Sequence, residues 1–387
     1  MNVTAPRVAL LALVDACRAC ASKKTQMPIL ENLLLIAEIQ AIGGKLQVAG
    51  TDLYVTLTGV VDADIAKPGT IAVSAAGLAE RIKSMPDGPV QIVQVKEGTA
   101  EIRAPGTKRH FSMPCTSATD FPRLPAPSGE AVKTTIDVGL LETLIARTSF
   151  AISLDSTRPH VNSLLLKFGQ ETLTAVATDG HRLAKAIAPF AGGKPDEWLV
   201  PFDAVGRLRD FLGAVPRPKK KAGDEASPGP ATVGVQRDRA TVFFTSAERT
   251  FSFKLVDAQF PPYDQVIPTR EHPVIFAPRE ALISVIRAVA LSSGKTGGVK
   301  IECVGGKLMV SVDDSEKGKA SDEVIIETKD TEHRMVGISS KYMVEAFGAI
   351  DTDQVSLDMD GELDPILIRA AGETLVKLDL VVMPMRI

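Results

Sequence analysis

The sequence predicts an α+β protein built from three similar domains, each with two helices packed on antiparallel sheets. Its 387 residues exceed one domain, since domains commonly hold about 100–200 residues. A pattern of helix, strands, helix and strands occurs three times, with a period of roughly 130–140 residues. Many strand segments alternate apolar and polar residues, which is typical of sheets with one solvated face. Together these observations favour three domains in a row over a solenoid of short repeats.

Each repeat is expected to open with an amphipathic helix, beginning near residues 6, 138 and 278. Pro6 and Pro278 suit the first turn of a helix, where a missing N–H costs nothing. Asp137 is suited to cap the helix that begins at Val138. In the first helix the apolar side chains fall on one face, at Leu10, Leu11, Val14 and Cys17.

A second helix is expected about seventy residues into each repeat, near Ser74, Pro201 and Ser339. Ser74 and Ser339 can cap helix N-termini, and Gly213 can end the middle helix. Strand-like segments lie between and after the helices. They are separated by the kind of turn that hairpins need, at Gly43-Gly44, Asp87-Gly88, Gly305-Gly306 and Asp360-Gly361.

Proline clusters mark the expected domain boundaries. Segments 121–130 and 267–274 are rich in proline, so domains are expected at residues 1–127, 128–269 and 270–387. The segment 217–230 is rich in proline, glycine and charge. It is expected to form a surface excursion that carries Lys219, Lys220 and Lys221.

Composition and charge argue against several classes of protein. The net charge of −3 and the isoelectric point near 6.0 provide no global basic field for nucleic acid, although a small basic surface remains compatible with them. Four scattered cysteines are too few for a disulfide framework, so a reducing cytoplasm is expected. No apolar run approaches the roughly 18–20 residues of a membrane span, so no membrane association is expected.

Cysteine and histidine spacing favours packing over redox or metal chemistry. Cys17 and Cys20 have the spacing of a redox pair, but they fall inside the first predicted helix with no strand before them. Cysteine also packs well as a small apolar side chain. The five histidines lie far apart in the sequence and form no pair with zinc-ligand spacing.

One short turn combines an acid, a base and a cation in the sequence Asp179-Gly180-His181-Arg182. An Asp-Gly pair favours a turn between strands, so a structural hinge is the simplest interpretation. A binding turn, or a hydrolase that uses Asp179 and His181, remain alternatives. The hydrolase would need a nucleophile from elsewhere, because the sequence has no GxSxG motif.

The end of the chain, LDLVVMPMRI, is strongly apolar. Proline cannot donate a hydrogen bond to a ladder, so Pro384 requires the last strand to stop by Met383. Methionine is favoured at adaptable binding surfaces. The tail is therefore expected to form a clip across the core or one side of a groove.

Five sequence stretches are spread over all three predicted domains. They are MPILENLLL from Met27, GTDLYVTL from Gly50, VATDGHRLA from Val176, KLVDAQFPPYDQVIP from Lys254 and the terminal VVMPMRI. Together they resemble the bacterial replicative sliding clamps, the beta subunits of DNA polymerase III. The combination of TDGHRLA with a terminal VMPMR is the most specific part of this resemblance.

The resemblance implies a fold, an assembly and a set of partners. Subunits of this family contain three DNA-clamp domains, and two subunits join head to tail as a homodimeric ring around duplex DNA. The ring is a non-catalytic processivity factor that uses no cofactor or metal. Its partners would be double-stranded DNA bound independently of sequence, the replicative polymerase alpha subunit, the clamp loader and other clamp-motif proteins. A plasmid, phage or resistance paralogue of the clamp would share these features.

The resemblance also implies which residues bind partners and DNA. A hydrophobic groove between the second and third domains would accept short linear peptides. Its residues would be Val161, Thr178, Gly180, His181, Arg182, Leu183, Pro261, Val266, Val381, Val382, Met383, Pro384 and Arg386. DNA contacts would come from Lys23, Lys24, Arg158 and His160. The chain departs from the family pattern at three DNA-contact positions, Ala76, Pro159 and His160, for which the run at Lys219 to Lys221 could compensate.

Overall fold

In a computed structural model of the protein, the described residues are 1–22, 26–41, 43–128, 132–192, 194–218, 230–269, 275–328 and 333–387. Lys23 and Lys24, and the run from Lys219 to Lys221, lie outside these residues. The chain forms two compact units. One comprises Met1–Val138 with Gly206–Leu255, and the other comprises Gly139–Val205 with Val256–Ile387.

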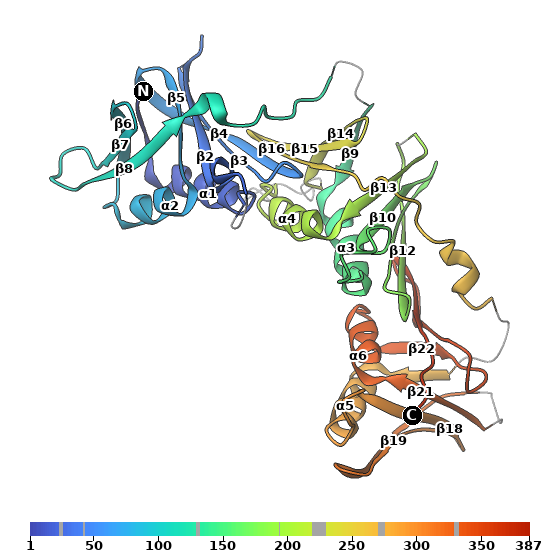
Figure 1. The fold of residues 1–387 in the computed structure, drawn as a ribbon. Helices are drawn as coiled ribbons and strands as arrows, with labels where there is room; N and C mark the ends of the chain where they lie inside the picture. Colours follow the sequence, from blue (N-terminus) through green and yellow to red (C-terminus); the bar gives the residue numbers. More distant parts are fainter. Residues whose placement is uncertain are drawn as a thin grey trace, which may run out of the picture. The chain divides into compact units, whose positions relative to one another are not determined.

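The first unit contains a twelve-stranded antiparallel sheet, in the order β1-β6-β7-β8-β5-β2-β3-β4-β16-β15-β14-β9 (Figure 1). Because β1 also pairs with β4, the first eight strands of this order form a closed circle of ladders. The strands of the first repeat are β1 (Asn2–Pro6), β2 (Asn32–Ile39), β3 (Gly44–Thr51), β4 (Val55–Lys67), β5 (Gly69–Ser74), β6 (Pro89–Lys96), β7 (Thr99–Arg103) and β8 (His110–Ser117). Those of the second repeat are β9 (Val132–Asp137), β14 (Thr232–Asp238), β15 (Thr241–Ser246) and β16 (Arg249–Lys254).

Helices α1 (Arg7–Arg18) and α2 (Ala75–Ser84) pack side by side in this unit (Figure 1). The expected cap is confirmed, because Ser74 Oγ accepts a hydrogen bond from the N–H of Gly77. The expected apolar face of α1 needs one correction. Leu13 is buried where Leu11 was expected, and Leu11 is half-buried. Both positions fit helical spacing, and contact with the sheet selects Leu13.

The second unit contains an eight-stranded and a four-stranded sheet, both antiparallel, in the orders β13-β10-β11-β12-β24-β23-β22-β17 and β20-β19-β18-β21. The eight strands are β10 (Ser163–Phe168), β11 (Thr172–Thr178), β12 (Arg182–Pro189), β13 (Asp196–Pro201), β17 (Ile275–Pro278), β22 (Gln354–Asp358), β23 (Ile366–Ala370) and β24 (Lys377–Val382). The four are β18 (Gly298–Val304), β19 (Lys307–Asp314), β20 (Gly318–Ile325) and β21 (Arg334–Ser339).

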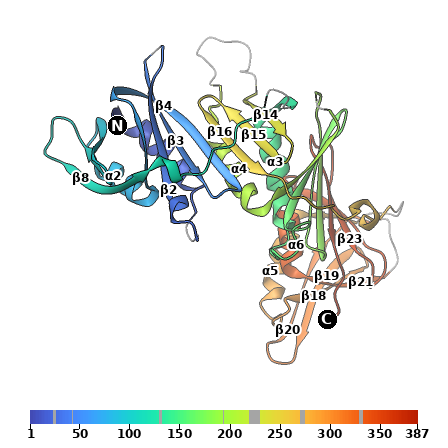
Figure 2. The same cartoon turned by 45° about the horizontal axis from the view of Figure 1, so that its top comes forward.

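Helices α5 (Arg279–Ala290) and α6 (Ser340–Gly348) contact each other and lie on one face of the four-stranded sheet (Figure 2). Ser339 caps α6, as the sequence predicts, because its hydroxyl accepts from the N–H of Tyr342. The middle repeat supplies α3 (Val138–Thr148) and α4 (Phe202–Gly213). All six expected helices are therefore confirmed. Among the described residues, none of them is long and apolar enough to cross a membrane.

Two ladders join strands that the sequence assigns to different domains. β4 of the first expected domain pairs with β16 of the second, and β12 of the second pairs with β24 of the third. The contacts of the middle domain are therefore divided between the two compact units. Ladders thus connect the expected domains on both sides of each boundary that proline clusters indicate. The limits at residues 127 and 269 stay a prediction.

Candidate functional site

The turn between β11 and β12 is held by its own side chains. Asp179 Oδ1 accepts hydrogen bonds from the backbone N–H groups of His181, at 2.9 Å, and Arg182, at 3.1 Å. Thr178 Oγ1 donates to the Arg182 carbonyl at 2.7 Å and accepts from the Gly180 N–H at 3.1 Å. Gly180 has a φ of +94°, a left-handed conformation that favours glycine. The motif thus builds a fixed turn that leaves His181 exposed.

Arg182 follows the turn, and its side chain is only 8% exposed. Its guanidinium lies 3.0 Å from Asp179 Oδ2, pairs with Glu345 of α6, and donates to the Phe150 carbonyl at 2.5 Å. It also lies over the ring of Tyr342, 4.4 Å from the centroid. Partial burial raises the pKa of the Tyr342 hydroxyl above its usual value. Arg182 is therefore fully engaged within the protein and connects the turn to α6.

The ladder between β12 and β24 divides the expected groove residues between two faces of the sheet. Leu183 lies opposite both Thr178 and Val381, so these three side chains share one face. Arg182 lies opposite Val382, and this pair belongs to the other face, where Arg182 meets α6. We call the first face the apolar face. Its buried members are Leu165, Val176, Leu183, Leu199, Leu367 and Val381.

The segment 256–267, which includes the short helix η4 (Tyr263–Val266), packs on the apolar face. Lys185 of β12 helps to hold this segment, because its Nζ lies 2.6 Å from Asp264 and 5.2 Å from the centroid of the Tyr263 ring. Pro261 and Val266, two of the expected groove residues, are half-buried in this segment. Their neighbours Phe260, Tyr263 and Ile267 are among the residues of this segment that pack on the apolar face.

The tail continues from β24 beside the turn. β24 ends at Val382, which confirms that the last strand stops before Pro384. The N–H of Met383 still donates to the His181 carbonyl at 2.9 Å. Met383 and Pro384 are half-buried, whereas Arg386 is exposed. Met383 therefore leaves the ladder next to the turn, two residues after Val381 of the apolar face.

The remaining expected residues lie in the loop before β10. Val161 is buried, and its N–H donates to the Arg158 carbonyl at 3.1 Å. Arg158 is exposed, and its Nη2 lies 3.5 Å from the carbonyl oxygen of Asp179. His160 is half-buried, and its carbonyl accepts a hydrogen bond from Ser163 Oγ at 3.1 Å. One expected DNA-contacting residue, Arg158, thus lies next to the turn.

An aspartate makes the same hydrogen bonds in the equivalent turns of the first and third repeats, although the third turn is one residue longer, as Asp314 pairs with Gly318. Asp52 Oδ1 accepts from the N–H groups two and three residues later, at 3.0 and 2.7 Å. Asp314 does the same at 3.0 and 2.9 Å, and these bonds lower the pKa of its carboxyl group. Asp52 also pairs with Arg207 of α4 at 2.5 Å. The Thr-Asp pair before the first two turns was the signal that could have identified them.

The cysteine pair in α1 has a packing role. Cys17 and Cys20 are buried, and burial raises the pKa of both thiols, that of Cys20 to about 12. A thiol that stays protonated is a poor nucleophile, so the redox interpretation loses its chemical basis. Within the described ranges, no group of three or more His, Cys, Asp and Glu side chains could hold a metal ion.

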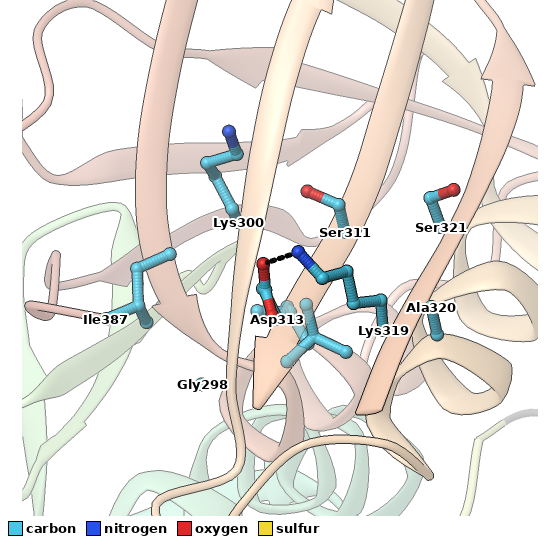
Figure 3. A pocket seen from close by; sticks show the side chains of 10 residues that line it. Gly298, Lys300, Ser311, Asp313, Lys319, Ala320, Ser321 and Ile387 are labelled. Atoms are coloured by element: carbon cyan, nitrogen blue, oxygen red, sulfur yellow. Dashed lines mark hydrogen bonds and ion pairs between the residues drawn. The ribbon is translucent and has the colours of Figure 1, made fainter. Parts of the chain in front are cut away.

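A cavity of about 540 Å³ opens on β18, β19 and β20, beside the terminal residue Ile387 (Figure 3). Lys319 Nζ lies 2.5 Å from Asp313 Oδ2, and Lys300 Nζ lies 3.1 Å from Glu302 Oε2. Each lysine near this cavity therefore has a carboxylate partner. The described lining residues include none of the expected groove residues.

Comparison with known proteins identifies the family. The DNA polymerase III beta subunit N-terminal, central and C-terminal domains match residues 1–125, 135–262 and 264–386. The chain is 30% identical over 391 residues to the beta sliding clamp of Pseudomonas putida, covering 100% of both chains. Crystal structures of the Pseudomonas aeruginosa sliding clamp, one of them bound to griselimycin, match 100% of both chains at 29% identity with TM-scores of 0.88. The chain therefore belongs to the DNA polymerase III beta subunit family, the beta sliding clamps.

Proposed function

We propose that this protein is a DNA sliding clamp, a homodimeric ring that encircles duplex DNA and tethers the replicative polymerase to it. Family membership over the whole chain supports this role. Processivity follows from topology, because a closed ring cannot leave circular duplex DNA without opening. A housekeeping clamp and a plasmid, phage or resistance paralogue would work in the same way. A cytoplasmic location follows from the role, since bacterial chromosomes are replicated there.

The observation that carries the proposal is the way in which successive repeats join. β4 and β12 each follow an aspartate turn, and β16 and β24 are each the last strand of their repeat. The ladders β4–β16 and β12–β24 therefore join equivalent strands. The next equivalent pair would be β20, at the edge of its sheet, and β8, the last strand of the first repeat. Among the described residues, β8 pairs with β5 only through Cys115, Thr116 and Ser117, so one side of its first half is open to a further strand. A second copy placed head to tail would supply this pair twice and close a ring.

The apolar face with the tail is proposed as the partner-binding site. Half-buried Met383 and Pro384 directly follow β24, whose Val381 shares the apolar face with Leu183. Half-buried Pro261 and Val266 belong to the segment that packs on this face. Short peptides with aliphatic or aromatic anchors suit such a surface. Partners would include the polymerase alpha subunit, the clamp loader and other clamp-motif proteins.

A non-catalytic role agrees with the geometry of the turn. The hydrolase alternative needs Asp179 to orient the imidazole of His181. Instead, Asp179 Oδ1 accepts from two backbone N–H groups, and its Oδ2 contacts Arg182. Both carboxylate oxygens are thus committed to the turn, which favours the structural and binding interpretations.

Loading onto nicked circular DNA tests the proposed ring. Labelled protein, loaded by a bacterial clamp loader with ATP, should stay on the circle during gel filtration and leave it after linearisation. Equal retention on linear and circular DNA would contradict the proposal.

In the same assay, replacing both Lys23 and Lys24 with Glu should reduce the fraction of protein retained on DNA, because attraction to the phosphates is lost. The difference from the wild-type protein should shrink as salt rises.

A further inference from the structure

The last residues of the chain contact two glycines of the four-stranded sheet. The N–H of Met385 donates to the carbonyl of Gly337 in β21 at 2.8 Å. A Cβ atom at Gly337 would overlap the carbonyl oxygen of Met385 and lie 2.9 Å from Ile387 Cγ1. A Cβ atom at Gly298 in β18 would lie 2.6 Å from Ile387 Cγ2. Figure 3 shows Ile387 and Gly298 on the same side of the cavity.

These two glycines provide space and are not needed for backbone conformation. Neither has a positive φ, so other residues could adopt their backbone angles. Gly298 lies opposite Ser339, and Gly337 precedes Ser339 by two residues, so both glycines belong to one face of the sheet. Side chains at such diagonal positions would normally approach each other. Their absence leaves a shallow surface, the glycine seat (Gly298 and Gly337), on which the tail backbone lies.

The glycine seat holds the tail just beyond the proposed partner-binding site. On one side of Pro384, the N–H of Met383 is bonded to the His181 carbonyl at 2.9 Å. On the other side, the N–H of Met385 is bonded to Gly337 at 2.8 Å. Pro384 itself has a restricted φ. The two residues that face a partner peptide are therefore fixed from both ends.

We infer that the glycine seat positions the partner-binding site: by holding Met385 to Ile387, it keeps Met383 and Pro384 beside the apolar face. This inference rests on the proposed function of that face. Gly298 and Gly337 are positioning residues, because they act through the tail and not on the peptide. Gly337 should matter more, since a methyl group there meets a backbone oxygen, whereas one at Gly298 meets the end of a flexible side chain.

Gly337→Ala in the full-length protein tests the inference. The probe is a fluorescent peptide with a glutamine and aliphatic and aromatic anchors. Its Kd should rise about tenfold or more, since binding sites lose complementarity when their supporting residues shift by about 1 Å. In hydrogen–deuterium exchange of the peptide spanning residues 377–387, the Met385 amide should exchange faster. Gly298→Ala should produce smaller changes in both measurements.

Gly234→Ala in β14 is the matched control. It is also a strand glycine without a positive φ, but its Cβ would meet only Thr245 O, at 3.6 Å, so neither measurement should change. If Gly337→Ala fails to fold, Ile387→Ala, which shortens the side chain that lies against both glycines, should weaken binding similarly. Wild-type affinity in Gly337→Ala or in Ile387→Ala would overturn the inference. Absence of binding by the wild-type protein would overturn the partner-binding site itself, a distinguishable result.

Discussion

Arg182 holds the turn of the proposed binding site from the face opposite the apolar face. Its guanidinium holds the turn through Asp179 and reaches Glu345 of α6 and the Phe150 carbonyl. Such a buried cation is costly unless all its hydrogen bonds are satisfied. Glu345 is one-third exposed, so water can replace part of its share of the interaction. Replacing Arg182 should therefore lower the free energy of unfolding more than replacing Glu345.

Arg182→Ala should destabilise the protein by about 3 kcal/mol, because the carboxylate of Asp179 and the Phe150 carbonyl lose their partner. Peptide binding should weaken as the turn loosens. Arg182→Lys should recover only part of the stability and of the peptide affinity, since one ammonium group cannot make all the hydrogen bonds of a planar guanidinium. Urea denaturation and peptide titration measure these effects. Lys319→Ala, which removes an exposed pair, is the control, and an equal midpoint for the two alanine variants would contradict the prediction.

At the scale of elements, β24 and the tail have separate tasks. β24 lies between β12 and β23, and its residue Val382 belongs to the face that meets α6. The tail begins at Met383, after the ladder, where its N–H donates to the His181 carbonyl. Removing the tail should therefore weaken the binding of partner peptides while leaving the sheet intact. The strand and the tail can be separated experimentally at this residue.

Deletion of residues 383–387 should abolish measurable binding of polymerase and loader peptides. Burial of one aliphatic anchor contributes about 1.5–3 kcal/mol, so loss of two anchor contacts weakens binding roughly a hundredfold or more. Met383→Ala should lose less, because the apolar face remains. Fluorescence anisotropy with labelled peptides measures both. The truncated protein should still form dimers in sedimentation, and wild-type peptide affinity after truncation would place the site elsewhere.

At the scale of the whole molecule, the repeats predict the register of the joint between subunits. Val55 of β4, three residues after Asp52, lies opposite Phe253 of β16. The equivalent of Val55 in the third repeat is Gly318, because the turn after β19 is one residue longer and Asp314 itself pairs with Gly318. The equivalent of Phe253 in the first repeat is Met113, since each follows a Phe-Ser pair. Gly318 of β20 should therefore lie opposite Met113 of a second copy.

This register places Ser321 opposite His110 of the second copy. Opposed residues of antiparallel strands have Cα atoms about 4.5–5.5 Å apart, within the range of a disulfide. Ser321→Cys combined with His110→Cys should give a covalent dimer on mild oxidation, seen by non-reducing electrophoresis. The native cysteines should not interfere, because all four are buried.

Glu323→Cys with His110→Cys is the control for this cross-link, because it shifts the pair by two residues. It should form little covalent dimer. Preferential cross-linking of the shifted pair would show that the register is wrong. Sedimentation that finds only monomer at micromolar concentration would contradict the ring as a whole.

The sequence by itself determined the local features of this protein. Six helices form where apolar periodicity predicts them, Ser74 and Ser339 cap two of them, and Pro384 follows the last strand. The fold class and the family also followed from motifs spread along the chain. The helices, their caps and the end of the last strand depend on neighbours within a few residues, because capping, turn geometry and helical spacing are local.

The tertiary structure decided which residues share a surface. The register of β12 with β24 places Leu183 with Val381 and sends Arg182 to the opposite face, a division that the resemblance alone does not show. The partners of Arg182 in α6 and the contact of Gly337 with the tail come from distant parts of the sequence. Such placements depend on strand register, because a shift by one residue moves every side chain to the other face. Only the folded chain sets that register.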